Sequence, residues 1–266
     1  MPAAWWVNRK VATREIRPGI RSYSVLILAL DTTTRDGSVA VSRNDTIVAV
    51  VQGDGSRTHG ERLPGEIERA LSASGVSLRE LDLLAVASGP GAFTGLRIGL
   101  AAVQGLAMVL GTPVVGVSAL DALACATWPG IAAPHETCLV TWMDAGRGEV
   151  FGADYVSDFH STDFPWRQRA APIVGLPSAI LATFEPGPDL RATFVGDGAL
   201  KYRTTIESCS AGRWPIVAPP MSLAPAIATI AGRLAARGLA GPPHALQPLY
   251  VRRPDAELER LRHTGR

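Results

Sequence analysis

Hydrophobic and polar positions follow a strand-like pattern over the first part of the chain. Residues 25–30 form a continuous apolar run that ends in Asp31, which is typical of a buried central strand. Two further runs, at 38–42 and 46–51, are separated from it and from each other by short turn sequences. The pattern predicts three consecutive strands joined by short hairpins.

The pattern then changes to the 3.6-residue period of amphipathic helices. Apolar residues recur on one face over 61–72, and a longer apolar pattern covers 94–110. Strands are predicted at 81–87 and 113–117, and a helix at 119–126. The order β-β-β-α-β-α-β-α favours a mixed sheet flanked by helices over a fully parallel, doubly wound sheet.

After Pro129 the pattern is less regular. Two strands are predicted at 139–143 and 149–155, around a turn that contains two glycines. Shorter elements follow: a helix at 178–184, a strand at 193–195 and a helix at 224–237. We therefore expect four parts: an N-terminal extension (1–24), an N-terminal lobe (25–128), a smaller C-terminal lobe (129–254) and a charged tail (255–266).

The N-terminal extension does not follow the pattern of either lobe. It carries two tryptophans and several basic residues, without the apolar segment and small-residue cleavage site of a secretion signal. The first clean strand begins at Val25, so one hypothesis is that Val25 is the true start and that the gene start is over-extended. Detection of residues 1–24 in the native protein by intact-mass analysis would refute this.

Composition narrows the class of protein only slightly. The chain is 47% hydrophobic and 19% charged, so it can bury a sizeable core. It has 26 basic and 24 acidic residues, a balance that neither requires nor excludes a nucleic-acid partner. Its three cysteines are scattered, without zinc spacing, which indicates reduced thiols and a cytoplasmic protein. No apolar run reaches the ~18 residues of a membrane span.

The most specific motif is SGPGAFTGLRIG at residues 88–99, between a predicted strand and a predicted helix. Backbone N–H groups at such a junction can bind an anion or dock closely on another backbone. The motif has neither the P-loop lysine nor the G-x-G-x-x-G spacing. Gly95 and Gly99 each cost a helix up to ~1 kcal/mol, which close packing can offset, either inside the chain or against another subunit.

This motif, with several others in order, resembles the TsaB family. The resemblance runs from about Val25 to Arg252. It implies a two-lobed α/β fold of the actin, heat-shock chaperone and sugar-kinase type, which is ribonuclease H-like and has mixed sheets. The supporting segments are ILALDTTT (27–34), QGLA (104–107), GVSAL (116–120), DAGRGEVF (144–151), VGDG (195–198) and PLYVR (248–252).

The resemblance also implies a role in making threonylcarbamoyladenosine on tRNA. TsaB-like proteins are similar to the catalytic subunit TsaD, pair with it and act together with the ATPase TsaE. The complex transfers threonylcarbamoyl to N6 of the adenosine beside the anticodon in tRNAs that read ANN codons. This chain would be a non-catalytic scaffold that meets tRNA only through the complex and forms a homodimer in isolation. The helices at 61–72 and 94–110 would supply the interface, through Leu63, Ile67, Leu71, Gly95, Gly99 and Ala102.

Metal-dependent catalysis is not expected of this chain. The catalytic paralogue holds its metal with two histidines one helical turn apart, so that both imidazoles reach one ion. No two histidines lie within four residues of each other here, and Leu63 stands four residues after His59. We interpret His59 as a surface or capping residue.

Nucleotide binding by the chain alone is also not expected. Asp31 occupies the position that helps to hold magnesium in the superfamily, but the turn after it has no glycine before Gly37. Asp31, Thr33 and Gly198 would form at most a vestigial nucleotide site, with ATP and Mg²⁺ bound only within the complex. The alternative is that Asp31 caps its own turn and that Gly198 serves backbone geometry.

Two other constellations leave alternatives. Asp144, Arg147 and Glu149 surround a turn and form either a structural hairpin or a partner contact. Ser118, Asp121 and His135 lack a G-x-S-x-G elbow, which argues against a hydrolase triad.

An alternative function from another class is an ATP-dependent phosphotransferase or a metallopeptidase-like enzyme. The missing histidine pair and the poor phosphate loops count against both.

Overall fold

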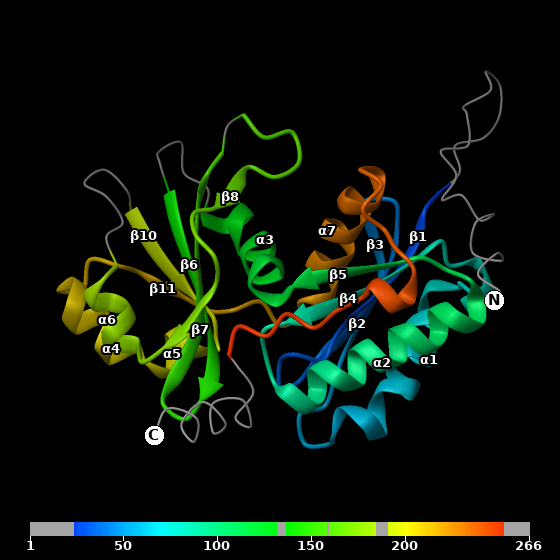
Figure 1. Ribbon diagram of the computed structural model, residues 1–266, viewed down its shortest axis with the longest axis horizontal. Helices are drawn as coiled ribbons and strands as arrows, with labels where there is room; N and C mark the ends of the chain where they lie inside the picture. Colours follow the sequence, from blue (N-terminus) through cyan, green and yellow to red (C-terminus); the bar gives the residue numbers. More distant parts are fainter. Residues whose placement is uncertain (1–23, 132–136, 159, 185–190, 253–266) are drawn as a thin grey trace, which may run out of the picture. The chain divides into compact units, whose positions relative to one another are not determined.

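The computed structural model describes residues 24–131, 137–158, 160–184 and 191–252 (Figure 1). The predictions for residues 1–23, for His135 and for the tail at 255–266 concern residues outside these ranges. The chain divides into two compact units: Met1–Ser88, Ala92–Ala122 and Met221–Pro248 in the first, and Gly89–Gly91, Leu123–Pro220 and Leu249–Arg266 in the second.

The first unit is built on a mixed five-stranded sheet in the order β3-β2-β1-β4-β5. β1 pairs antiparallel with β2 and parallel with β4, so the three hairpin-linked strands continue into a parallel part. This confirms the predicted mixed sheet. The strands are β1 (Leu26–Asp31), β2 (Ser38–Arg43), β3 (Thr46–Gln52), β4 (Leu83–Gly89) and β5 (Val114–Ser118).

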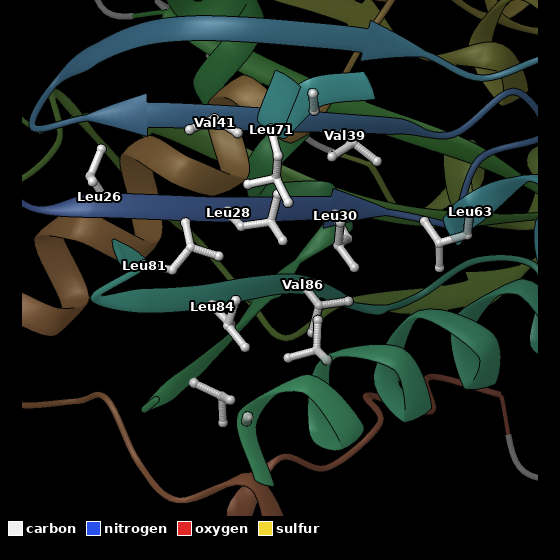
Figure 2. Close-up of a cluster of buried hydrophobic side chains, with 14 of the residues drawn as sticks. Leu26, Leu28, Leu30, Val39, Val41, Leu63, Leu71, Leu81, Leu84 and Val86 are labelled. Atoms are coloured by element: carbon white, nitrogen blue, oxygen red, sulfur yellow. The ribbon is translucent and has the colours of Figure 1, made fainter. Parts of the chain in front are cut away.

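Two long helices cover one face of this sheet (Figure 1). α1 (His59–Ser74) begins where the Glu61 carboxylate accepts a hydrogen bond from the backbone N–H of Thr58 at 2.9 Å, and α2 is Phe93–Leu110. Figure 2 shows the core beneath these helices, where side chains of alternate strand positions meet those of α1. Its labelled residues include Leu28, Leu30, Leu84 and Val86 of the strands and Leu63 and Leu71 of α1.

α2 is the one helix of the described ranges whose length and apolarity would allow it to cross a membrane. Its inner residues Leu96, Leu100 and Val103 are buried in the core of the first unit. Burial in this core accounts for part of its apolar character.

α7 (Ala224–Ala236) lies on the opposite face of the sheet and contacts β1, β2 and β5 (Figure 1). Its first residue donates its backbone N–H to the Ser38 hydroxyl at 3.1 Å. The short η2 (Pro243–Ala245) follows. Gln104 of α2 donates to two carbonyls there, that of Pro243, the first residue of η2, and that of Leu246, the residue after η2. The structure therefore assigns 221–248 to the first unit, whereas the sequence predicted a C-terminal lobe running from 129 to 254.

The second unit contains a six-stranded sheet in the order β11-β10-β6-β7-β8, with β9 paired to β7. An aromatic cluster fills its core: the rings of Trp142 and Phe194 meet edge to face at 5.2 Å, and Trp214 stacks on Phe194 at 5.6 Å. Its strands are β6 (Thr137–Gly146), β7 (Glu149–Ser157), β8 (Trp166–Gln168), β9 (Ile173–Gly175), β10 (Arg191–Val195) and β11 (Ile216–Val217).

Of the remaining helices, α3 is as long as α7 and the others are short. Ser118 caps the helix after β5, because its hydroxyl accepts a hydrogen bond from the backbone N–H of Asp121 at 3.3 Å. η1, α5 and α6 were not predicted, because a few residues cannot display a hydrophobic period. These elements are η1 (Leu78–Glu80), α3 (Ala119–Ile131), α4 (Pro177–Ala182), α5 (Asp197–Lys201) and α6 (Arg203–Ser210).

Candidate functional site

The turn after β1 is held by the carboxylate of Asp31, which is buried. Oδ1 accepts hydrogen bonds from the backbone N–H of Thr33 at 2.8 Å and from its hydroxyl at 2.6 Å. Oδ2 accepts one from the hydroxyl of Thr34 at 2.5 Å, and that hydroxyl in turn accepts the backbone N–H of Gly37 at 3.2 Å. Both carboxylate oxygens are thus engaged by the turn itself. This geometry favours the capping role of Asp31 and Thr33 over a role in holding magnesium or phosphate.

His59, the first residue of α1, connects the helix to this turn. Its Nδ1 lies 2.8 Å from Nη2 of Arg62, and its Nε2 lies 3.0 Å from the carbonyl oxygen of Thr34. Because arginine can only donate, Nδ1 must be the acceptor, and Nε2 therefore carries the hydrogen that it donates to Thr34. Burial and the neighbouring guanidinium lower the pKa of His59. The ring is a neutral bridge between two elements, not the surface or capping residue that the sequence suggested.

A buried ion pair lies beside this histidine. Arg62 and Glu66 of α1 are joined at 2.6 Å, with side chains only 4% and 2% exposed. Arg62 also donates to the carbonyl oxygens of Arg35 at 3.1 Å and Arg57 at 3.3 Å. One guanidinium therefore fastens α1, the turn after β1 and the loop before α1 to one another. We did not predict this pair, and its only sequence signal was an Arg and a Glu four residues apart in a helix.

The glycines of α2 face the same turn. A Cβ at Gly95 would lie 2.1 Å from the carbonyl oxygen of Thr32, and one at Gly99 would lie 2.2 Å from the hydroxyl oxygen of Thr32. Both glycines therefore allow α2 to approach the residue that follows β1. Gly105, in contrast, is exposed, and a Cβ there would meet nothing within 4 Å. Close packing inside the chain thus explains Gly95 and Gly99.

The residues predicted for a subunit interface differ in how deeply they are buried. Four are buried in the first unit, namely Leu63, Leu71, Gly95 and Gly99, so their side chains or Cα atoms already face its core. Ile67 and Ala102 are half-buried and pack against that core from its border. Whether any of them meets a partner stays a prediction.

An apolar strip runs along the outside of α2. Residues spaced by four positions form a row that runs obliquely along a helix surface, and Phe93, Arg97, Ala101, Gly105 and Val109 follow this spacing on the exposed side of α2. All five are exposed. With the adjacent Met108 they form what we call the outer strip of α2. Val109 is 85% exposed, Met108 62% and Phe93 49%, and the Arg97 guanidinium lies 4.0 Å from the centre of the Phe93 ring.

In the second unit, the loop that begins α5 is fastened to β6. The Asp197 carboxylate accepts the backbone N–H of Asp144 at 3.0 Å and that of Gly198 at 2.9 Å. Lys201 pairs with the Asp144 carboxylate at 2.7 Å. A Cβ at Gly198 would lie 2.9 Å from the backbone carbon of Met143, so this glycine serves a close backbone contact. Burial raises the pKa of Asp197.

The β6–β7 hairpin accounts for the other predicted constellation. Arg147 at its tip has a φ of 56° between two glycines that also have positive φ. Glu149 forms an ion pair with Arg252, which also donates to the carbonyl oxygen of Ala145 at 3.0 Å. Asp144 and Glu149 therefore have separate partners, and their contacts favour the structural hairpin.

The described residues include no group of three or more His, Cys, Asp or Glu side chains that could hold a metal ion. Asp31 and Gly198, from the two ends of the predicted nucleotide site, belong to different units. Each is engaged in contacts of its own unit. Whether a nucleotide and its magnesium ion bind near either residue stays a prediction.

Comparisons with known proteins show which family this chain belongs to. The family model described as TsaD, tRNA N6-adenosine threonylcarbamoyltransferase, matches residues 49–212. The TsaB protein of Escherichia coli is 39% identical over 132 residues, which are 50% of this chain and 55% of that protein. The structure of YeaZ from Pseudomonas aeruginosa superposes with a TM-score of 0.69 at 27% identity, over 85% of this chain and 99% of that one. This chain belongs to the TsaB family.

An uncharacterized protein of Mycobacterium tuberculosis is 32% identical over 234 residues, covering 87% of this chain and 93% of its own length. The likeness to that protein therefore extends over most of this chain. Membership of the TsaB family connects this chain to tRNA threonylcarbamoyladenosine biosynthesis. The YeaZ likeness, together with the two mixed sheets, confirms the expected α/β fold with mixed sheets.

Proposed function

We propose that this TsaB-family protein is the non-catalytic, activating subunit of a tRNA threonylcarbamoyltransferase and acts by dimerising with TsaD. The observation that carries the proposal is the outer strip of α2. Its large apolar residues Phe93, Met108 and Val109 are exposed on a helix whose opposite face is buried. Exposed apolar patches can mark interaction sites in soluble proteins.

The composition of the outer strip suits packing against another helix. Ala101 and Gly105 lie in its middle, where small residues allow two helix backbones to approach closely. The bulkier Phe93 and Val109 stand at its ends and can pack into the grooves of a partner helix. The half-buried Ala102 borders the same surface. In isolation, a second copy of the chain would cover this surface.

The absence of catalysis is part of the same proposal. The carboxylate of Asp31 is engaged by Thr33 and Thr34, and Gly198 is in close backbone contact with β6. These contacts support a chain that does not bind ATP and Mg²⁺ tightly by itself and that meets ATP, TsaE and tRNA only in the assembled complex. We place the assembly in the cytoplasm, where its tRNA substrate is found.

A charge in the outer strip tests the dimer. Val109→Lys should abolish capture of purified TsaD and the stimulation of tRNA modification in a reconstituted reaction, with an unchanged thermal unfolding curve. Ile173→Lys is the matched control, because Ile173 is an exposed apolar residue of the second unit, 46% exposed. Unchanged TsaD binding by Val109→Lys would overturn the proposed interface.

Calorimetric titration with ATP and Mg²⁺ separates the scaffold from the alternative enzyme. We expect no tight binding to this chain alone, and binding only when TsaD is present. Tight binding to the isolated chain would favour a phosphotransferase.

A further inference from the structure

The imidazole of His59 is confined by three elements of the first unit. Its two nitrogens bond to Arg62 of α1 and to the carbonyl of Thr34 in the turn after β1. A Cβ at Gly37 would lie 2.8 Å from the ring, and one at Gly95 of α2 would lie 3.0 Å from it. The ring therefore lies between two glycines, Gly37 and Gly95, which approach its two edges closely because neither has a side chain. These contacts restrict the movement of the ring.

Protonation of this ring is incompatible with the arrangement. A proton on Nδ1 would remove the acceptor of Arg62 and place a second donor against a guanidinium nitrogen 2.8 Å away. Two positive charges would then face each other in a partly buried place. Either the guanidinium or the imidazole must move.

The surrounding charges do not remove this conflict. Arg62 opposes a charged ring, whereas Asp31 and Glu66 favour it. Glu66 already neutralises Arg62 at 2.6 Å, and Asp31 is engaged by Thr33 and Thr34. The α2 residue against the ring is Gly95, which carries no charge. Burial and Arg62 outweigh the two carboxylates, so the pKa of His59 lies below its ordinary value of 6.5.

We propose that His59 and Arg62 form a proton-operated latch, which is closed while the imidazole is neutral and opens when the imidazole is protonated. Arg62 also holds the carbonyls of Arg35 and Arg57. Displacing its guanidinium would therefore release the turn after β1 and the loop before α1 together. The ring also borders Gly95, two residues from the start of the outer strip at Phe93. Opening of the latch would loosen this end of the docking surface, and this last step rests on the proposed function.

The ring itself is tested first, in the full-length protein without a partner. Nuclear magnetic resonance titration of the histidine Cε1–H signals should give His59 an apparent pKa below 6.5 and a neutral form protonated at Nε2. The signal is assigned by its loss in His59→Gln, whose amide can still accept from Arg62 and donate to Thr34 but cannot titrate. An apparent pKa at or above 6.5, or a neutral form protonated at Nδ1, would overturn the latch.

The consequence for the fold is tested by urea unfolding between pH 7.5 and pH 5. The unfolded chain binds a proton more readily than the native ring, so the wild type should lose stability as the pH falls below about 6.5. The loss amounts to about tenfold in the unfolding constant for each unit by which the pKa is lowered. His59→Gln should lose less, whereas His244→Gln, which changes an exposed histidine of the same unit, should follow the wild type. Equal losses in all three proteins would contradict the proposal.

Partner binding is measured last, so that the two proposals fail separately. Affinity for TsaD should weaken from pH 7.5 to pH 5.5 in the wild type more than in His59→Gln. If TsaD binds at neither pH while the titration and unfolding results hold, the proposed dimer is wrong and the latch stands. If TsaD binds with the same pH dependence in both proteins, the link between latch and docking surface is wrong. Should His59→Gln fail to fold, the wild-type titration and the pH dependence of hydrogen exchange at Gly37 still decide the matter.

Discussion

Gly99 of α2 lies so close to Thr32 that a Cβ on the glycine would be 2.2 Å from the threonine hydroxyl oxygen. The same Cβ would lie 3.3 Å from a methyl carbon of Val86. The most specific motif of the sequence therefore ends in a glycine that fits α2 onto the strand–turn junction of its own unit. The outer strip of the same helix, which includes Gly105, is exposed and is the surface that we propose binds a partner.

Alanine at these two glycines should have opposite effects on stability. Gly99→Ala forces Thr32 or α2 to shift, and we expect the free energy of unfolding to fall by about 1–3 kcal/mol. Gly105→Ala adds a methyl group in open space and favours the helix, so the free energy should rise by up to about 1 kcal/mol. Urea unfolding of both variants measures the difference. A similar loss in both would show that the contact with Thr32 is not the cause.

The contact predicts a specific rescue. Thr32→Ala removes the hydroxyl oxygen and leaves the threonine Cβ, which lies 3.4 Å from the Cβ built at Gly99. The double variant Thr32→Ala, Gly99→Ala should therefore lose less free energy of unfolding than the two single variants lose together, by about 0.5–3 kcal/mol. Gly95→Ala should not be rescued by Thr32→Ala, because its Cβ would meet the Thr32 backbone carbonyl at 2.1 Å. Additive losses at Gly99 would contradict the geometry.

Two adjacent threonines should respond differently to valine. The hydroxyl of Thr32 is buried and has no hydrogen-bond partner among the residues that the structure describes, so Thr32→Val removes an unsatisfied polar group. We expect its free energy of unfolding to be unchanged or to rise by about 1 kcal/mol. Thr33→Val removes a hydroxyl that donates to Asp31 at 2.6 Å and should lower the free energy by about 1–3 kcal/mol. Equal effects in thermal or urea unfolding would refute the assignment.

The sequence predicted the elements of the first unit that have long, regular patterns. The run at 25–30 and the period over 94–110 correspond to β1 and to α2. It did not place α7 on β1 and β2, because Ala224 and Ser38 are 186 residues apart and their contact leaves no local period. The two-residue β11 and the five-residue α5 are too short to be recognised.

The candidate site shows the same division. The apolar run predicted that the strand ends at Asp31, and Asp31 is the last residue of β1. Whether that carboxylate would hold a ligand or its own turn depended on the orientation of Thr33 and Thr34. The bond from His59 to the carbonyl of Thr34 depended on the approach of α1 to a turn 25 residues earlier in the chain. Tertiary contacts of this kind are not encoded in the spacing of single residues.

The ion pair of α1 should matter far more than a similar pair on the surface. Glu66→Gln leaves the guanidinium of Arg62 buried and uncompensated, and we expect a loss of about 3–5 kcal/mol in the free energy of unfolding. Arg203 and Glu207 of α6 have the same spacing, but their side chains are 46% and 48% exposed. Glu207→Gln should therefore cost no more than about 0.5 kcal/mol. Comparable losses in urea unfolding would show that burial does not strengthen the α1 pair.

The carboxyl of Asp197, which is partly desolvated although the residue is exposed, should give the second unit an opposite pH dependence. Burial raises its pKa above the ordinary 3.8, so the native state holds this proton more tightly than the unfolded chain. The resulting stability is fully present below about pH 3.8 and is lost as the pH rises through the native pKa. Asp197→Asn keeps an oxygen to accept the N–H groups of Asp144 and Gly198 and removes the charge.

At pH 7 the Asp197→Asn variant should therefore be at least as stable as the wild type. The gain should shrink as the pH falls toward 4, because the wild-type carboxyl then becomes neutral as well. Fluorescence of Trp142 and Trp214, which lie in the core of the second unit, can follow urea unfolding at both pH values. Asp158→Asn changes a carboxylate that caps a turn of the same unit and serves as the control. A loss of stability in Asp197→Asn at pH 7 would show that the carboxylate charge is needed there, most directly to balance Lys201 beside Asp144.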